Sequence, residues 1–351
     1  MPIAIMSKPL RAPAVPSVRI LVFVFLGLLH LGWLTGCAGT PDPEKSIKLL
    51  TIGNSFTANA LTYVPEFAAK DGKPLIIFPA HIGGASLETH AKAVSLYTEN
   101  PANPDAQIYR TFGGNYSVKR HSLAEILTTQ KWDYITIQES TSRARQTDFS
   151  TESLRILVEF IRIHAPQAKI FLFEPWSSRE NRSPMPDGSP TSSQLAYNRI
   201  HTESLRLAAK FNLTLLPIGT AFQNARNTPL WQITTKDPDF DYENPPEGKL
   251  PDQTGSLIVG WSWGRTGNAP LRMQLDTIHA NSAGSYLGGA VIYEAISGTD
   301  IRNLPLNVKD VSSSRAENLR ELAHAALVES QPPAPSAPAA GSPPPPAATS
   351  Q

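Results

Sequence analysis

Residues 48–57 read K-L-L-T-I-G-N-S-F-T, and this stretch decides the fold expected for the chain. The apolar run at 49–52 is typical of a buried β-strand. Gly53 ends the run, and a helical pattern begins near Ala58. A strand, a tight turn and a helix in this order place Ser55 at the carboxyl edge of a sheet, where the helix dipole favours a nucleophile. A serine that only caps the helix fits the same pattern, so both interpretations stay open here.

Four more apolar runs follow the first at intervals that suit alternating strands and helices. They occupy residues 75–78, 134–137, 170–173 and 213–216. Helical patterns lie between and after them, at residues 58–69, 122–129, 152–164, 194–211, 281–298 and 314–329. This alternation predicts an α/β fold in which five parallel strands carry helices on both faces.

Composition limits the classes of protein that the chain can belong to. The 351 residues are 41% hydrophobic, which is enough for a substantial core. The net charge is +1 and the Lys and Arg residues are scattered, so no nucleic-acid partner is expected. A single cysteine excludes an intramolecular disulfide and a cysteine-based metal site.

The first 36 residues are expected to be a signal peptide. Three cations precede an apolar run at 20–33 that is shorter than the roughly 20 residues of a membrane-spanning helix. L-T-G-C at 34–37 then resembles a bacterial lipobox, in which Cys37 becomes the lipidated first residue. An incidental thiol is the alternative to this lipidation. Ala38 follows the cysteine, and the absence of Asp at this position resembles the signal for sorting to the outer membrane. An exported lipoprotein of the cell envelope is therefore expected.

The folded domain is expected to span residues 47–329, after a polar tether at 37–46. Residues 227–275 show no sustained periodicity and are expected to form an irregular insertion, which is often a functional feature. The tail at 330–351 is rich in Pro and Ala, and eight of the 32 prolines lie in the last 21 residues. Such a tail cannot bury a core and is expected to be disordered or extended.

Three tryptophans stand out in the expected insertion. Trp231, Trp261 and Trp263 could line a sugar-binding surface, because aromatic rings stack on sugars. Rings that only attach an irregular loop to the domain explain them equally well.

Asp276 and His279 form D-x-x-H on an expected loop before the helix that starts near residue 281. A serine hydrolase needs a base for the serine proton and a carboxylate that orients the base. A spacing of three residues allows one turn to carry both groups. A histidine at the start of a helix and a turn-forming aspartate are the alternatives.

Four sequence blocks occur together in a characteristic order. They are G-N-S-F at 53–56, G-G-A-S-L at 83–87, W-D-Y-I-T-I-Q at 132–138 and D-x-x-H at 276–279. In this order the blocks resemble the SGNH (GDSL-like) hydrolase superfamily, and more narrowly a bacterial lipoprotein group whose first block reads G-N-S-F. The resemblance covers residues 47–298.

The resemblance implies a flavodoxin-like three-layer α/β/α sandwich with strand order 2-1-3-4-5. It also implies that Ser55 is the nucleophile, His279 the base and Asp276 the group that orients the base. The backbone N–H groups of Ser55 and Gly84 would bind the oxyanion. No metal or organic cofactor is implied.

Gln138 departs from the family pattern, which usually has an Asn oxyanion donor in the third block. A Gln amide can donate the same hydrogen bond from a side chain one methylene longer. Alternatively, Gln138 only holds the loop that begins at Glu139.

These observations predict a lipid-anchored serine esterase that hydrolyses short-chain esters, with acetyl groups on carbohydrate as the expected substrate. Family members also include lipases and thioesterases. A catalytically inactive carbohydrate-binding protein and a structural envelope lipoprotein, each with a hydrolase-like fold, are the alternatives. Labelling of Ser55 by a fluorophosphonate distinguishes the enzyme from both.

Overall fold

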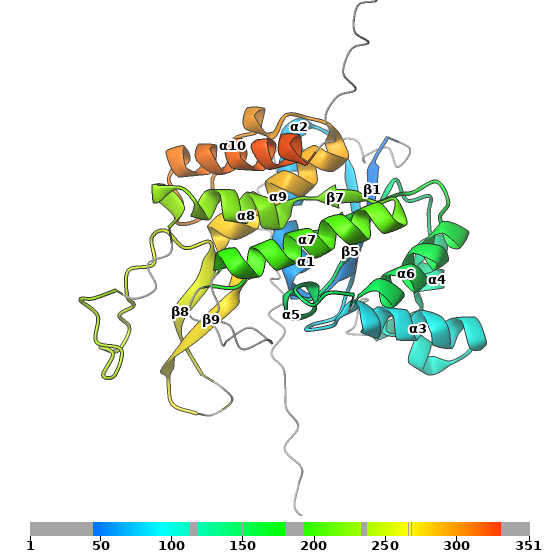
Figure 1. Cartoon of the computed structure of the whole chain (residues 1–351), viewed down its shortest axis with the longest axis horizontal. Coiled ribbons are helices and arrows are strands. Elements are labelled where there is room, and N and C mark those ends of the chain that lie inside the picture. Colours follow the sequence, from blue (N-terminus) through cyan, green and yellow to red (C-terminus); the bar gives the residue numbers. More distant parts are fainter. Residues whose placement is uncertain are drawn as a thin grey trace, which may run out of the picture.

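The computed structural model describes residues 45–112, 118–148, 150–179, 193–232, 237–265, 267 and 269–330. The expected signal peptide, Cys37, the tether up to residue 44 and the tail from 331 onward lie outside these residues. A five-stranded sheet covered by helices forms the body of the molecule, and two separate hairpins accompany it (Figure 1). Within the described ranges, no helix combines the length and apolarity needed to span a membrane.

The central sheet contains the five expected strands, and every neighbouring pair is parallel. Its order is β2-β1-β5-β6-β7, which becomes 2-1-3-4-5 when only these strands are numbered. The predicted flavodoxin-like sandwich is therefore confirmed. Because the strands are parallel, their carboxyl ends share one edge of the sheet. The strands are β1 (Ile47–Gly53), β2 (Leu75–His81), β5 (Tyr134–Gln138), β6 (Lys169–Phe173) and β7 (Thr214–Leu216).

Alternate side chains of each strand face opposite sides of the sheet, and each side has its own apolar core. Leu49 and Phe171 belong to the core under α1, α2, α8, α9 and α10. Leu50 and Leu172 belong to the core under α3, α4, α6 and α7. In Figure 1, α3, α4 and α6 lie on one side of β1 and β5, and α8, α9 and α10 lie on the other. The helices are α1 (Ser55–Leu61), α2 (Val64–Asp71), α3 (Leu87–Glu99), α4 (Leu123–Thr128), α5 (Thr141–Ala144), α6 (Thr151–His164), α7 (Ser193–Phe211), α8 (Ile218–Arg226), α9 (Ser282–Ser297) and α10 (Ser313–Glu329).

Helix α9 packs closely against α1 because small residues line their contact. A Cβ atom added to Gly288 would lie 3.1 Å from the Cβ of Ala60, so a larger residue would push the helices apart. Helix α1 begins at Ser55, and α9 begins three residues after His279. The close helix contact therefore helps to bring Ser55 and His279 together.

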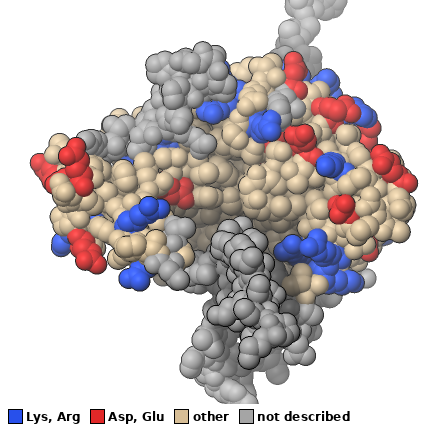
Figure 2. All heavy atoms as spheres, turned by 90° about the horizontal axis from the view of Figure 1, so that it is seen from below, with Lys and Arg blue, Asp and Glu red and all other residues tan. Residues whose placement is uncertain are grey.

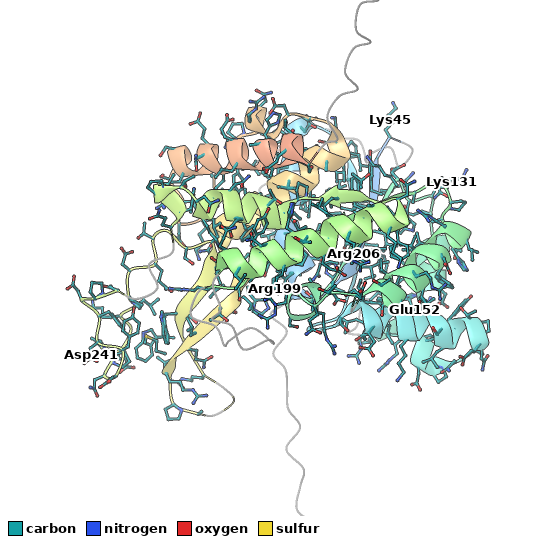
Figure 3. The ribbon with its side chains drawn as sticks, in the orientation of Figure 1. Lys45, Lys131, Glu152, Arg199, Arg206 and Asp241 are labelled. Atoms are coloured by element: carbon teal, nitrogen blue, oxygen red, sulfur yellow. The ribbon has the colours of Figure 1, made fainter. Side chains whose placement is uncertain are left out.

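The expected irregular insertion contains a hairpin, so the prediction for 227–275 is wrong over part of its length. Strand β8 (Ile258–Gly264) pairs antiparallel with β9 (Arg272–Ala280) outside the central sheet. Glycines interrupt the alternation in β8, which hides the strand from a periodicity test. Residues 237–257 are irregular, and Asp241 of this segment stands away from the sheet in Figure 3.

Other elements also escaped the sequence analysis. The pattern at 58–69 is two helices, and Pro65 lies in the first turn of α2, where its missing N–H costs nothing. Helices α3 and α8 were not predicted. Strands β3 (Tyr109–Phe112) and β4 (Val118–His121) form a second antiparallel hairpin, and single 3₁₀ turns occupy Pro104–Ala106, Pro229–Trp231 and Ile301–Asn303.

The face shown in Figure 2 carries charges of both signs on its described part. Lys and Arg side chains gather at one place at the lower right, and elsewhere Lys, Arg, Asp and Glu are interspersed. This mixture agrees with the net charge of +1.

Candidate active site

The serine turn follows β1 as expected, and the residue before the serine caps the helix. Asn54 is 2% exposed, and its Oδ1 accepts a hydrogen bond from the Phe56 N–H at 3.0 Å. Its Nδ2 donates to the carbonyl of Ala85 at 2.8 Å, which ties the turn to the loop after β2. Because Asn54 is the N-cap, the interpretation of Ser55 as a capping serine is wrong.

Ser55, His279 and Asp276 form one continuous chain of hydrogen bonds. The distance between Ser55 Oγ and His279 Nε2 is 2.9 Å, and that between His279 Nδ1 and Asp276 Oδ2 is 2.7 Å. With Nδ1 protonated, the imidazole donates to Asp276 and accepts from the Ser55 hydroxyl. The structure thus brings together the three residues that the sequence motifs predicted, in an arrangement that can generate a serine nucleophile.

Asp276 and His279 lie on β9, whereas the sequence analysis placed them on a loop. Gly260 pairs with Asp276 and Ile258 pairs with Ala280, so three residues of β9 oppose one residue of β8. This bulge bends the strand and allows His279 to turn back toward Asp276, three positions earlier. Bulges are frequent beside active sites because they redirect a side chain in this way.

Asp276 is held as a carboxylate by the residues that follow it. Its Oδ1 accepts the backbone N–H groups of Ile278 and His279, both at 2.9 Å. Burial would raise the pKa of Asp276, but the hydrogen bonds from the His279 side chain and from these two N–H groups outweigh burial and lower it. An ionised Asp276 can orient His279 and stabilise the imidazolium that forms when His279 takes a proton.

Two residues of the pocket around the Ser55 hydroxyl, Ser55 itself and Gly84, have backbone N–H groups that could bind an oxyanion. Gly84 lies in the loop after β2 with φ of +71°, a conformation that favours glycine. Among the described residues, the N–H groups of Ser55 and Gly84 have no hydrogen-bond acceptor. Both residues line a pocket of about 230 Å³, together with Asn54, Phe56, Ser140, Thr141, Ser142, Ile278 and His279. Free N–H donors that line one pocket suit an oxyanion.

Gln138 does not reach this pocket, so its predicted role as an oxyanion donor is wrong. Its side chain is fully buried, and its Oε1 accepts from the Asn54 N–H at 3.0 Å and from the Thr57 hydroxyl at 2.9 Å. Its Nε2 donates to the carbonyl of Glu139. Gln138 therefore fixes the backbone of the serine turn at Asn54 and the backbone of the following loop at Glu139.

We expect Gln138→Ala to lower stability rather than to act on kcat alone. The change leaves the buried N–H of Asn54 without its acceptor, which costs about 1–3 kcal/mol. Thermal unfolding should show a lower Tm, and both kcat and KM should worsen. Gln167→Ala is the control, because Gln167 is exposed and makes a single bond to a backbone carbonyl. A stable Gln138→Ala protein that loses only kcat would contradict this assignment.

Glu139 is a site residue whose role the sequence did not reveal. It is 5% exposed, and its Oε1 accepts from the N–H groups of Leu87 and Ser140 at 3.2 and 2.6 Å. Its Oε2 accepts from the Ser150 hydroxyl at 2.6 Å. Burial raises the pKa of Glu139, and these hydrogen bonds oppose the rise. Glu139 thereby connects the start of α3 to the loop that lines the pocket.

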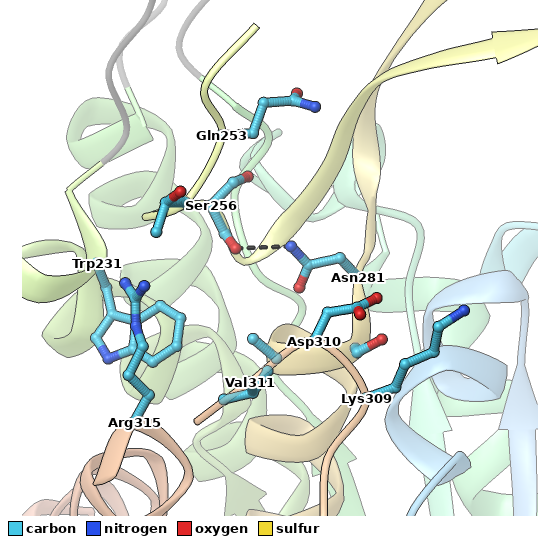
Figure 4. Close-up of a pocket in the computed structure, with 11 residues that line it drawn as sticks. Trp231, Gln253, Ser256, Asn281, Lys309, Asp310, Val311 and Arg315 are labelled. Carbon is cyan, nitrogen blue, oxygen red and sulfur yellow. Dashed lines mark hydrogen bonds between the residues drawn. The ribbon is translucent and has the colours of Figure 1, made fainter. Parts of the chain in front are cut away.

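Trp231 cannot form part of an open sugar-binding surface, so that prediction is wrong for this residue. It is 2% exposed, the Arg315 guanidinium lies 4.4 Å from its ring centroid, and its Nε1 donates to Asn318 at 2.8 Å. It forms one wall of a separate pocket of about 260 Å³ beside the start of α9 (Figure 4). Trp261 and Trp263 are partly exposed on β8, and their binding role stays a prediction.

One group of side chains in the described part of the chain has the composition of a metal site. Glu294, Asp300 and His324 place one ligand atom each within 4.8 Å of one another. His324 already bonds to Glu294 at 2.7 Å, and Arg302 makes a bidentate pair with Asp300. These ion pairs explain the cluster as a link between α9 and α10.

Comparison with solved structures finds matches at low sequence identity. A DUF4886 family protein from Bacteroides uniformis ATCC 8492 is 22% identical, with a TM-score of 0.59 over 81% of this chain and 95% of that one. A protein from Parabacteroides merdae ATCC 43184, described provisionally as a GDSL-like lipase, is 13% identical, with a TM-score of 0.40 over 72% and 96%. Phospholipase A1 from Streptomyces albidoflavus NA297 is 11% identical, with a TM-score of 0.36 over 71% and 98%.

The first of these similarities shows a shared fold. The comparison with curated proteins found no significant match. Residues 48–241, more than half of the chain, match the family described as "Domain of unknown function (DUF4886)". This range contains Ser55, Gly84 and Gln138, and ends before Asp276 and His279. The chain therefore belongs to the DUF4886 family, and it shares its α/β fold with the family member from Bacteroides uniformis.

Proposed function

We propose that this protein is a serine esterase that uses Ser55, His279 and Asp276. The observation that carries the proposal is the unbroken chain of hydrogen bonds from Ser55 Oγ through His279 to Asp276, at 2.9 and 2.7 Å. This series of hydrogen bonds ends at Ser55, in a pocket that is lined by both Ser55 and Gly84 and so holds their backbone N–H groups. A nucleophile, a base, an orienting carboxylate and oxyanion donors are the parts that acyl transfer requires.

The proposed reaction follows from these positions. His279 Nε2 takes the proton of Ser55 as Oγ attacks the ester carbonyl, and the new imidazolium is stabilised by Asp276. The N–H groups of Ser55 and Gly84 bind the oxyanion, after which His279 protonates the leaving alcohol. Water then attacks the acyl-serine with His279 again acting as the base, which releases the acid and restores Ser55.

A short acyl group, with acetyl as the first candidate, suits the pocket best. The pocket of about 230 Å³ is smaller than the range of about 300–1,000 Å³ typical of sites for larger ligands. Ser140, Thr141 and Ser142 line it together with the apolar side chains of Phe56 and Ile278. The small volume disfavours a long hydrocarbon chain.

A panel of p-nitrophenyl esters tests this function. We expect hydrolysis of the acetate, and kcat/KM lower by about tenfold or more for the octanoate, because extra methylenes do not fit. A fluorophosphonate should label the wild type, and mass spectrometry should place the label on Ser55. A clear preference for long chains would indicate a lipase, and absence of labelling and of hydrolysis would contradict the enzyme.

Carbohydrate is the proposed alcohol part of the substrate. Trp261 and Trp263 lie on the same face of β8, and Trp261 pairs with Leu275, next to Asp276. Both rings are partly exposed on the hairpin that also carries Asp276 and His279. Trp261→Ala with Trp263→Ala should raise KM on acetylated xylan and leave KM on p-nitrophenyl acetate unchanged. Equal effects on both substrates would restrict these rings to a structural role.

The proposed location is the cell envelope, with the chain anchored to a membrane through lipid on Cys37. The support is the sequence around Cys37. Membrane fractionation of the wild type and of Cys37→Ser measures this directly, and equal release of both proteins into the soluble fraction would remove the anchor from the proposal.

A further inference from the structure

The strand that carries His279 is not hydrogen-bonded to the central sheet. Strand β9 pairs with β8 in a separate two-stranded sheet, whereas Ser55 follows β1 in the five-stranded sheet. The 2.9 Å contact between Ser55 and His279 therefore depends on other interactions that hold the hairpin against the body.

Three hydrogen bonds around His279 make this connection. The Arg179 N–H donates to the carbonyl of Thr277 at 2.8 Å, and the Trp176 Nε1–H donates to the carbonyl of Ile278 at 2.8 Å. The N–H of Ala280 donates to Asn59 Oδ1 in α1 at 3.2 Å. Two of these bonds come from one segment after β6, and the bond from Trp176 ends on the residue next to His279.

The same tryptophan also contacts the serine turn. Its ring is fully buried and stacks on Phe56, the residue after Ser55, with centroids 4.5 Å apart. On its other face it stacks on Phe222 of α8 at 4.6 Å, with planes 8° apart. Its backbone carbonyl accepts a hydrogen bond from Thr141 of the pocket wall at 3.2 Å.

We infer that Trp176 is the positioning residue that holds Ser55 and His279 at their working distance. Two of its contacts lie one residue from a group of the site: Phe56 is next to Ser55, and Ile278 is next to His279. A ring wedged between two aromatic neighbours cannot turn, so its N–H holds the backbone at Ile278 in one place. The inference rests on the proposed function, because it concerns the geometry of that reaction.

The test removes the N–H of Trp176 while its shape is kept. Benzothienylalanine in place of Trp176 replaces the indole N–H by sulfur, and Trp176→Phe is the simpler genetic variant. Trp132 is the matched control, because it is 1% exposed and its Nε1 donates to the carbonyl of Ile126 at 3.1 Å in the other core. At both sites the replacement acts on a buried indole whose N–H donates to a backbone carbonyl.

We expect the change at Trp176 to lower kcat by about 100-fold with KM within threefold, because a shift of about 1 Å in a reacting group has this effect. The change at Trp132 should lower Tm by a similar amount and leave kcat within about twofold below the unfolding transition. Equal losses of kcat at the two sites, or none at Trp176, would overturn the inference.

A second measurement does not depend on turnover. In the protein labelled with ¹⁵N-histidine, the Nε2 shift of His279 reports its hydrogen bond with Ser55. Changes at Trp176 should move this shift toward its value in Ser55→Ala, and changes at Trp132 should not. If the wild type hydrolyses no ester, the proposed function fails, and the NMR comparison still decides whether Trp176 sets the geometry. An unmoved Nε2 shift in the Trp176 variants would refute that role.

Discussion

Ser55→Ala is expected to lower kcat for ester hydrolysis by about 10⁶-fold, the loss typical of removing the nucleophile of a serine triad. The physical reason is that alanine has no group to form the acyl intermediate, while the oxyanion donors remain. Fluorophosphonate labelling should disappear at the same time. The Tm should change little, because Asn54 rather than Ser55 caps α1.

Ser313→Ala is the matched control for this change. Ser313 is the first residue of α10 and follows the N-cap Ser312, as Ser55 follows Asn54 at the start of α1. The control is exposed and should keep full activity and labelling. Turnover close to that of the wild type in purified Ser55→Ala would exclude Ser55 as the nucleophile.

Asp276→Asn is expected to lower kcat by about 10⁴-fold, because an amide in this position favours the wrong tautomer of His279. Asn can still accept the N–H groups of Ile278 and His279 through its Oδ1, so the bulge of β9 should persist. Steady-state kinetics and a crystal structure of the variant would separate lost chemistry from lost geometry. A loss below about tenfold would mean that Asp276 is not needed to orient His279.

The lowered pKa of Asp276 also predicts that the stability of the protein depends on pH. The pKa of Asp276 is lowered on folding, so the carboxylate stabilises the protein above its unfolded pKa, which is about 3.9. This stabilisation is lost as the pH falls through the folded pKa. The difference in unfolding free energy between the wild type and Asp276→Asn should therefore shrink in acid. Asp252→Asn is the control for activity, because Asp252 is an exposed aspartate whose pKa is also lowered, here by bonds from Thr254.

Local sequence was sufficient for the five strands of the sheet, the serine turn and the pair of residues in D-x-x-H. The apolar runs predicted all five strands, because burial on both faces of a parallel sheet requires near-continuous apolar residues. Asp276 and His279 are three residues apart, so the bonds between them are local. Where the pattern was broken by glycine, as in β8, the sequence did not reveal the strand.

The tertiary structure decided what the remaining side chains do. Gln138 ends a correctly predicted strand, but the pairing of β5 with β1 places its amide beneath the turn rather than in the pocket. Trp231 lies in the segment expected to carry sugar-binding rings, but contacts with α10 bury it. Trp176 belongs to none of the sequence motifs. Its inferred role depends on contacts with Phe56, Phe222 and Ile278, which are far apart in sequence. A residue's own type and near neighbours set its propensity, whereas its burial and hydrogen-bond partners depend on which distant segments pack against it.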